Sequence, residues 1–168
     1  PHASSSAASD VYKRQKENNI IFIRHAIAPG NGDPPNFDIL DCSTQRNLSK
    51  EGELQALKIG KFFKENDINF TKVISSEWCR CKDTAKIAFG NYETKNFLNS
   101  FYDERFSENK DKQILDFQKF IKNWNYSGNL ALVTHYVVIS EILDFATSSG
   151  EIVITDNNLK FLGSLEIN

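Results

Sequence analysis

Two arginines and two histidines stand at positions where the sequence indicates chemistry. Arg24 and His25 directly follow the apolar run at residues 20–23, and Arg80 and His135 follow two later apolar runs. An arginine presents a planar fork of hydrogen-bond donors to phosphate or carboxylate, and a histidine supplies a nucleophile or a proton carrier near neutral pH. Taken alone, Arg24 and His25 also fit an ordinary strand end, with a solvated arginine and a histidine that binds a backbone carbonyl. The four side chains therefore indicate a site only if the fold brings them together.

The alternation of strand and helix patterns along the chain predicts that the fold brings these four side chains together. Residues 20–23 are apolar and mostly β-branched, which is typical of a central strand with both faces covered. Further strands are predicted at residues 72–75 and 130–135, helices at 50–64, 76–89, 110–124 and 136–145, and a hairpin at 150–166. The fold class is α/β, a three-layer α/β/α sandwich around a mostly parallel mixed sheet. Because ligands of open α/β sheets bind beyond the carboxyl ends of the strands, the two arginines and two histidines are expected at one edge.

The connections beside these strand ends carry predictions too. Residues 27–48 are rich in Gly, Pro, Asn and Asp, and we interpret this long segment as a wall or lid of the site, with a floppy insertion as the alternative. Ser75 or Ser76 is expected to cap the helix that contains Arg80, which leaves free backbone N–H groups for an anion. Arg80 then lies in the first turn, where a cation opposes the helix dipole unless a bound anion compensates it.

The totals fit one compact domain without a polyanionic partner. The chain has 168 residues, of which 40% are hydrophobic, and a formal net charge of -2. These values favour a small molecule or a protein as substrate over nucleic acid, and no apolar run approaches the ~20 residues needed to span a bilayer. Residues 1–18 are predicted to be disordered or introduced by cloning or sequence assembly, and residues 19–168 to form a single domain. The native start, with any signal peptide, is then expected to be missing, which leaves a cytoplasmic and a periplasmic location both open.

The three cysteines make neither a disulfide framework nor a zinc site. Cys79 and Cys81 form a Cys-x-Cys pair and Cys42 is distant, which lacks the ligand spacing of structural zinc sites. Unmetallated thiols are the preferred interpretation, and in an exported protein Cys42 can pair with either Cys79 or Cys81. We predict no metal and no cofactor.

Two arginines and two histidines together suit a tetrahedral dianion. Guanidinium groups form bidentate, charge-assisted hydrogen bonds with phosphoryl oxygens. Positioning and charge stabilisation supply most of the catalysis in phosphoryl transfer. A neutral imidazole can attack phosphorus and carry the group as a covalent intermediate. One histidine is then the nucleophile, and the other binds the equatorial oxygens.

With these residues in this order, the sequence resembles the histidine phosphatase superfamily, which is also called phosphoglycerate mutase-like. Four elements between residues 20 and 156 carry the resemblance: Arg24-His25-Ala26, Leu48-Ser49-Lys50-Glu51-Gly52, SSEWCRCKDTA at residues 75–85, and Val133-Thr134-His135. The resemblance implies a phosphoglycerate mutase-like fold and phosphorylation of His25. It also implies that Arg24, Arg80 and His135 hold the phosphoryl group and that no metal is required.

The departures from the family pattern concern the proton donor for the leaving group. Ala26 replaces the usual Gly, a change that the backbone can tolerate, and Tyr136 stands where phytase-like members carry Asp. The proton-donating Glu of the mutases has no unambiguous counterpart. By distance along the chain, Glu104 is the first candidate for the general acid, followed by Asp103 and then Asp33. Each of them also fits an ordinary solvated carboxylate.

The favoured function is a metal-independent phosphatase that hydrolyses a small-molecule phosphomonoester through a phosphohistidine intermediate. Asn31, six residues after His25, is a further candidate for binding a phosphoryl oxygen. Two alternatives stay open: a protein phosphohistidine phosphatase, whose good leaving group needs no acid, and a non-catalytic binder of a phosphorylated ligand. A mutase ranks last, because the chain lacks the long inserts with which mutase-like members hold a second phosphate.

Overall fold

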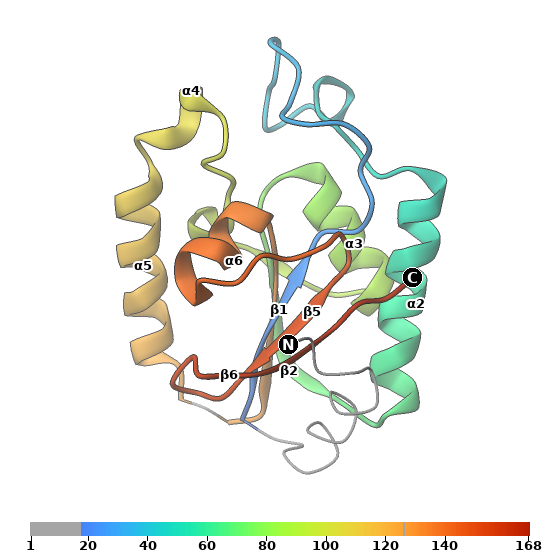
Figure 1. Cartoon of the computed structure of the whole chain (residues 1–168), viewed down its shortest axis with the longest axis vertical. Coiled ribbons are helices and arrows are strands. Elements are labelled where there is room, and N and C mark those ends of the chain that lie inside the picture. Colours follow the sequence, from blue (N-terminus) through green and yellow to red (C-terminus); the bar gives the residue numbers. More distant parts are fainter. Residues whose placement is uncertain (1–17, 126) are drawn as a thin grey trace.

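A six-stranded mixed sheet forms the centre of the molecule (Figure 1). The computed structural model describes residues 18–125 and 127–168. The strands are β1 (Ile20–Arg24), β2 (Phe70–Ser75), β3 (Glu93–Thr94), β4 (Asn129–Thr134), β5 (Ile152–Thr155) and β6 (Phe161–Leu165), in the order β3-β2-β4-β1-β5-β6. The first four strands in this order pair in parallel, and β5 and β6 pair antiparallel at the other edge. The predicted fold class and the predicted terminal hairpin are confirmed, while the predicted 1–18 segment lies, apart from Asn18, outside the described residues.

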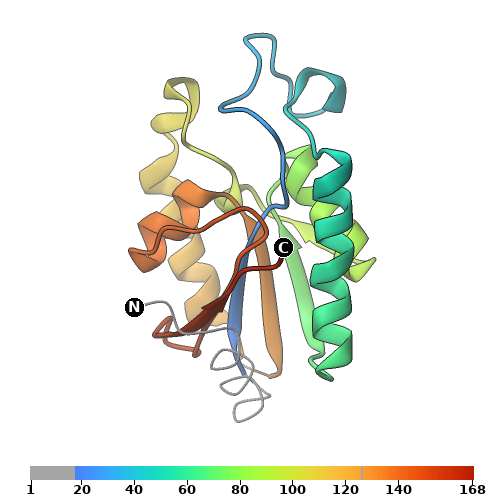
Figure 2. The same cartoon turned by 45° about the vertical axis from the view of Figure 1, so that its right-hand side comes forward.

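Helices cover both faces of this sheet (Figure 2). One face carries α2 (Lys50–Glu65) and α3 (Cys79–Phe89), and the other carries α5 (Lys110–Asn123) and α6 (Tyr136–Leu143). Three short helical segments lie in the connections: η1 (Cys42–Thr44), η2 (Asn96–Leu98) and α4 (Glu104–Ser107). Alternate residues of β1 serve the two hydrophobic cores, because Ile21 and Ile23 pack on the α2 and α3 side and Ile20 and Phe22 on the other. A strand buried on both faces has no polar alternation, as its sequence predicts.

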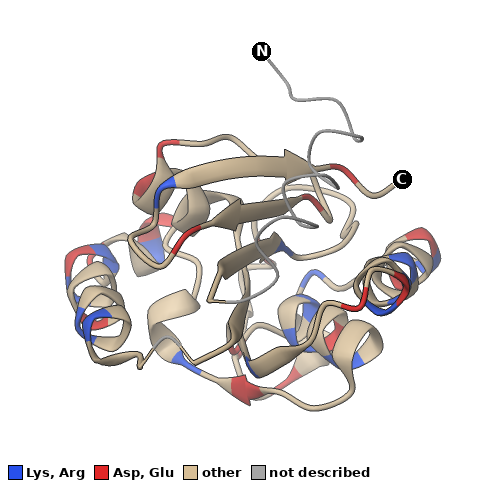
Figure 3. Cartoon of the chain, turned by 90° about the horizontal axis from the view of Figure 1, so that it is seen from below, with Lys and Arg blue, Asp and Glu red and all other residues tan. Residues whose placement is uncertain are grey.

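Basic and acidic residues are interspersed along the helices on both sides of the sheet (Figure 3). Within the two described ranges, no helix is long and apolar enough to cross a membrane.

The N-terminus of α3 differs from the prediction. Neither Ser75 nor Ser76 caps the helix: the N-cap is Trp78, whose side chain makes no capping hydrogen bond, and the helix begins at Cys79. The first amide of the helix, Cys79 N–H, instead donates to Gln45 Oε1 of the first loop at 2.9 Å. A long-range side chain therefore does what a local serine was expected to do.

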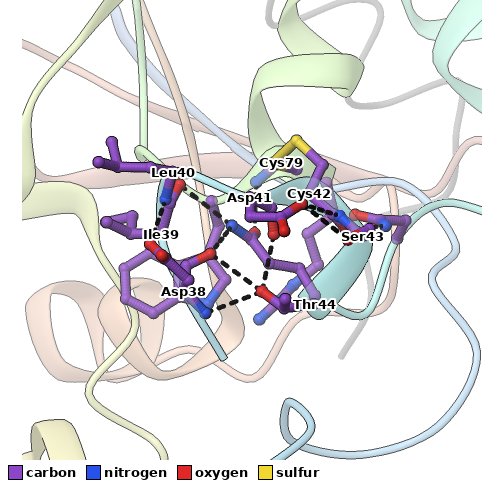
Figure 4. Close-up of a disulfide and its surroundings, with 12 residues drawn as sticks. Asp38, Ile39, Leu40, Asp41, Cys42, Ser43, Thr44 and Cys79 are labelled. Atoms are coloured by element: carbon purple, nitrogen blue, oxygen red, sulfur yellow. Dashed lines mark hydrogen bonds between the residues drawn. A yellow bond between two sulfur atoms is a disulfide. The ribbon is translucent and has the colours of Figure 1, made fainter. Parts of the chain in front are cut away.

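A disulfide joins the first loop to this same helix start (Figure 4). Cys42 is bonded to Cys79, the first residue of α3, whereas Cys81 is a buried free thiol. Beside the bond, Asp41 accepts the amide hydrogen of Ser43 and so caps η1. Of the two pairings that the sequence left open for Cys42, the structure has the one with Cys79, and this bond ties the loop at residues 27–48 to the start of α3 as a wall over the strand ends.

Candidate active site

The predicted arginines and histidines meet in a cavity of about 260 Å³ beyond the carboxyl ends of β1, β2 and β4, whereas Glu104 does not line it. Its lining includes all of the predicted phosphate-binding residues, Arg24, His25, Asn31, Arg80 and His135. It also includes residues that the sequence did not single out for binding, among them Asp33, Arg46, Trp78, Asp103 and Tyr136. The three strand ends therefore deliver their side chains to one place, because β2, β4 and β1 are adjacent and parallel.

His25 is buried and held in one orientation. Its backbone N–H donates to Thr134 O at 2.9 Å, and its ring nitrogen Nδ1 lies 2.8 Å from Ala26 O. A carbonyl oxygen only accepts, so Nδ1 carries the hydrogen in this contact. In the neutral ring, Nε2 then keeps a lone pair, as a nucleophile requires.

His135 is fixed in the opposite tautomer. Nη2 of Arg80 lies 3.5 Å from His135 Nδ1, and since a guanidinium only donates, Nδ1 accepts. Nε2–H then donates to Ser76 Oγ at 2.8 Å, and the serine hydroxyl in turn donates to Asn99 Oδ1 at 3.1 Å. The two imidazole rings stand nearly edge to face, with their centroids 5.5 Å apart.

Both imidazoles are neutral at ordinary pH. Burial, followed by the positive charge of Arg80, lowers the pKa of His25 well below its usual value. The same two causes, in the same order, lower the pKa of His135. The arginines supply the positive charge of the site, and the neutral rings keep a lone pair that no proton occupies.

Two arginine N–H groups in this cavity have no partner among the described residues. The Nε atoms of Arg24 and Arg80 are buried, and neither donates a hydrogen bond to any residue that the structure describes. Arg24 is otherwise well held, since Nη1 donates to Thr147 O and the guanidinium lies 5.6 Å from the ring centre of Tyr136. Buried donors without acceptors are rare and costly in folded proteins, so this pair indicates a place for an anion.

Arg46 and Trp78 line the cavity but were not predicted from the sequence, and Asp33, the third candidate for the general acid, binds Arg80. Arg46 comes from the first loop, and its side chain donates to the carbonyls of Gly32 and Ala28. Burial, followed by the charge of Arg80, lowers the pKa of Arg46. The loop composition predicted a wall of the site, but no periodicity in a loop shows which of its side chains point inward.

The three candidate general acids lie in three different situations. Glu104, the first candidate, is an exposed residue at the start of α4 and does not line the cavity. Asp103 lines it, but its carboxylate binds Arg105 with both oxygens, and these hydrogen bonds lower its pKa to about 2. Burial raises the pKa of Asp33, yet hydrogen bonds and charge from Arg80 outweigh this and leave the pKa below its usual value. Neither Asp33 nor Asp103 holds a proton ready for a leaving group.

The buried histidines predict acid sensitivity of the fold. Below pH 6.5, the unfolded value, these histidines bind protons in the unfolded state but stay neutral in the folded state, whose pKa is lower. The free energy of unfolding is therefore highest above pH 6.5 and falls as the pH drops below it. Each of the two histidines should add about 1.4 kcal/mol per pH unit to the loss. Urea unfolding of the wild type and of His135→Asn between pH 6.5 and 5 measures this, because the variant lacks one of the two groups. Equal slopes for both proteins would contradict the prediction.

Known proteins resemble this chain in sequence and in fold. A family model described as histidine phosphatase superfamily (branch 1) matches residues 20–111. The broad-specificity phosphatase YOR283W of Saccharomyces cerevisiae is 30% identical over 93 residues, which are 54% of this chain and 39% of that protein, so the match spans about two fifths of its relative.

Solved structures share the fold at low identity. The protein histidine phosphatase SixA complexed with tungstate matches with a TM-score of 0.61 and 13% identity, over 88% of this chain and 96% of that one. A phosphoglycerate mutase from Thermus thermophilus matches with a TM-score of 0.59 and 16% identity, over 89% and 99%.

Proposed function

We propose, from the premise that this chain belongs to the histidine phosphatase superfamily, that it is a metal-independent phosphatase acting through a phosphohistidine at His25. One observation carries the proposal. Arg24 and Arg80, each with a buried Nε–H that has no partner among the described residues, line the same cavity as two neutral histidines of opposite tautomer. This arrangement supplies donors for the phosphoryl oxygens and a lone pair for phosphorus.

The proposed reaction has two displacements. Nε2 of His25 attacks phosphorus, an N–P bond forms, and the P–O bond to the leaving group breaks with its electron pair on oxygen. Arg24 and Arg80 hold the equatorial oxygens, where charge accumulates in the transition state, and His135 joins them once its Nε2–H turns from Ser76 Oγ to a phosphoryl oxygen. Water then attacks phosphorus, the N–P bond breaks, and His25 recovers its lone pair while inorganic phosphate leaves.

A second candidate function concerns the leaving group. The two carboxylates that line the cavity, Asp33 and Asp103, are both committed to arginines and ionised. An alkoxide needs a proton in order to leave, whereas a nitrophenolate leaves without one, and a phosphohistidine ring leaves as neutral imidazole when its other nitrogen already carries a proton. This observation favours an activated phosphoryl substrate, such as a phosphohistidine protein. We therefore rank a phosphohistidine protein and a phosphomonoester equally as candidate substrates.

A substrate panel in the presence of EDTA tests both functions. Wild-type protein is assayed with p-nitrophenyl phosphate, a simple alkyl phosphate and a phosphohistidine protein. Turnover of any of them in EDTA supports the metal-independent phosphatase, and the ranking of the alkyl phosphate decides between the two substrate classes. A chain that binds phosphate but turns over none of the three would instead be the non-catalytic binder.

The same substrates test the acid candidates. Because Glu104 lies outside the cavity, Glu104→Gln should change the rate on the alkyl phosphate by less than about threefold, whereas a true donor would cost ~10²–10⁴ there and far less on p-nitrophenyl phosphate. Asp103→Asn is the companion variant, since Asp103 does line the cavity. A large loss confined to the alkyl phosphate in either variant would identify that residue as the acid.

A further inference from the structure

Asp33 grips the outer end of the Arg80 guanidinium. Its two carboxylate oxygens accept from Nη1 at 2.8 Å and from Nη2 at 3.2 Å. Both side chains are almost fully enclosed, with 6% of Asp33 and 3% of Arg80 exposed. A bidentate, buried contact of this kind fixes the plane of the guanidinium as well as its position.

The Asp33 carboxylate has no capacity left for another role. Oδ1 also accepts the backbone N–H of Arg46 at 3.0 Å, and Oδ2 also accepts Nε1–H of Trp78 at 3.0 Å. Each oxygen therefore receives two hydrogen bonds, which fills the lone pairs that would hold a proton or a substrate hydroxyl. Asp33 is thus neither an acid nor a direct contact for a neutral ligand in this arrangement.

Arg80 keeps one pair of donors free of Asp33. A guanidinium has an end fork, formed by Nη1 and Nη2, and a side fork, formed by Nε and Nη2. Asp33 occupies the end fork. On the side fork, Nη2 also donates to His135 Nδ1 at 3.5 Å, and Nε–H has no partner among the described residues. Nε–H is therefore the donor of Arg80 that is left for an equatorial oxygen of a group bound in the cavity that Arg80 lines.

We propose that Asp33 is the positioning residue that turns the side fork of Arg80 toward the phosphoryl group. The proposal rests on the proposed function of this cavity. It has a definite sign, because a carboxylate this close to a bound dianion is repulsive, so its removal would tighten anion binding if Arg80 stayed in place. Positioning predicts the opposite, namely weaker binding and slower turnover once the guanidinium loses its anchor.

The test compares Asp33→Asn with a matched control from the same loop. Asp38→Asn makes the same change at an exposed carboxylate whose Oδ1 accepts the backbone N–H of Leu40. Asp33→Asn should weaken the affinity for inorganic phosphate about tenfold and lower kcat/KM by about 10–100-fold, with a loss in kcat as well as a rise in KM. Asp38→Asn should change neither. Tighter phosphate binding by Asp33→Asn would overturn the proposal.

A readout without catalysis separates this proposal from the proposed function. In protein with isotope-labelled arginine, the Nη–H signals of Arg80, identified by their loss in Arg80→Lys, should be protected from exchange in the wild type, because both nitrogens donate to Asp33, and should lose that protection in Asp33→Asn. An unchanged signal would overturn the positioning role even if the enzyme is active. Absence of turnover by the wild type would overturn the proposed function and leave this comparison intact.

Two further variants guard against a general loss of structure. Trp78→Phe keeps the aromatic packing and removes one donor to Asp33, so it should shift phosphate affinity in the same direction by about threefold. In an Arg80→Lys background, Asp33→Asn should add less than about twofold, because coupled residues are not additive. Full additivity of the two changes would show that Asp33 acts independently of Arg80.

Discussion

Replacing His25 by Asn should abolish phosphatase turnover, with kcat reduced by ~10⁴–10⁶ as for other covalent nucleophiles. The amide of Asn can still donate to Ala26 O, as Nδ1 does in the wild type, so the fold should persist. What the variant lacks is the lone pair of Nε2. Wild-type protein quenched during turnover should carry a phosphate that is lost in acid and survives base, and His25→Asn should carry none.

His135→Asn serves as the matched control, because it removes the other buried imidazole and leaves the nucleophile. It should still form the acid-labile phosphoenzyme, but more slowly. Activity of His25→Asn within tenfold of the wild type would remove His25 from the nucleophilic role. A label that survives acid and is lost in base would instead indicate a carboxylate or a thiol.

Replacing Arg80 by Lys should lower kcat/KM by ~10²–10³, the usual effect of removing one donor that stabilises developing charge. Lysine keeps the positive charge opposite Asp33, so no buried carboxylate is left unpaired and the fold should be retained. It lacks the planar fork, however, and cannot bind Asp33 with one edge and a phosphoryl group with the other. Inhibition by vanadate should weaken in parallel with the rate.

Lys61→Arg is the control, because it also exchanges one basic side chain for another, at an exposed residue of α2 that pairs with Glu65 on the same helix. It should leave the rate and the inhibition by vanadate unchanged. A melting temperature close to that of the wild type shows that Arg80→Lys is folded. If the folded variant keeps its rate and its vanadate inhibition within about threefold, charge alone suffices and the fork geometry is irrelevant.

The sequence predicts the parts of this site that strands deliver. The apolar residues of β1 fix its place in the sheet, and the position of Arg24 and His25 directly after it follows from chain continuity. His135 follows β4 in the same way. Because parallel neighbouring strands end at one edge, these side chains had to meet once the fold class was known.

Contacts made by the first loop could not be predicted in this way. The bond between Asp33 and Arg80 joins residues 47 positions apart, and nothing periodic links them. The N-cap was misplaced because Gln45 of the same loop, and not a neighbouring serine, binds the first amide of α3. The pairing of Cys42 with Cys79 rather than Cys81 likewise depends on which face of the helix start meets the loop.

That disulfide closes a covalent ring that contains η1, α2 and β2, with its two cysteines 37 positions apart. By the chain-entropy relation, a ring of this size lowers the conformational entropy of the unfolded chain and so stabilises the folded state by about 4 kcal/mol. Its two ends also lie beside the pieces of the candidate site, since Cys79 is next to Arg80 and η1 leads into Arg46. Reduction of this one disulfide should therefore affect both the stability of the whole fold and the geometry of the candidate site. The reduced protein should have a lower free energy of unfolding, and its first loop should no longer be held at the start of α3. Activity and resistance to unfolding should therefore change at the same midpoint potential when the protein is titrated with a reductant.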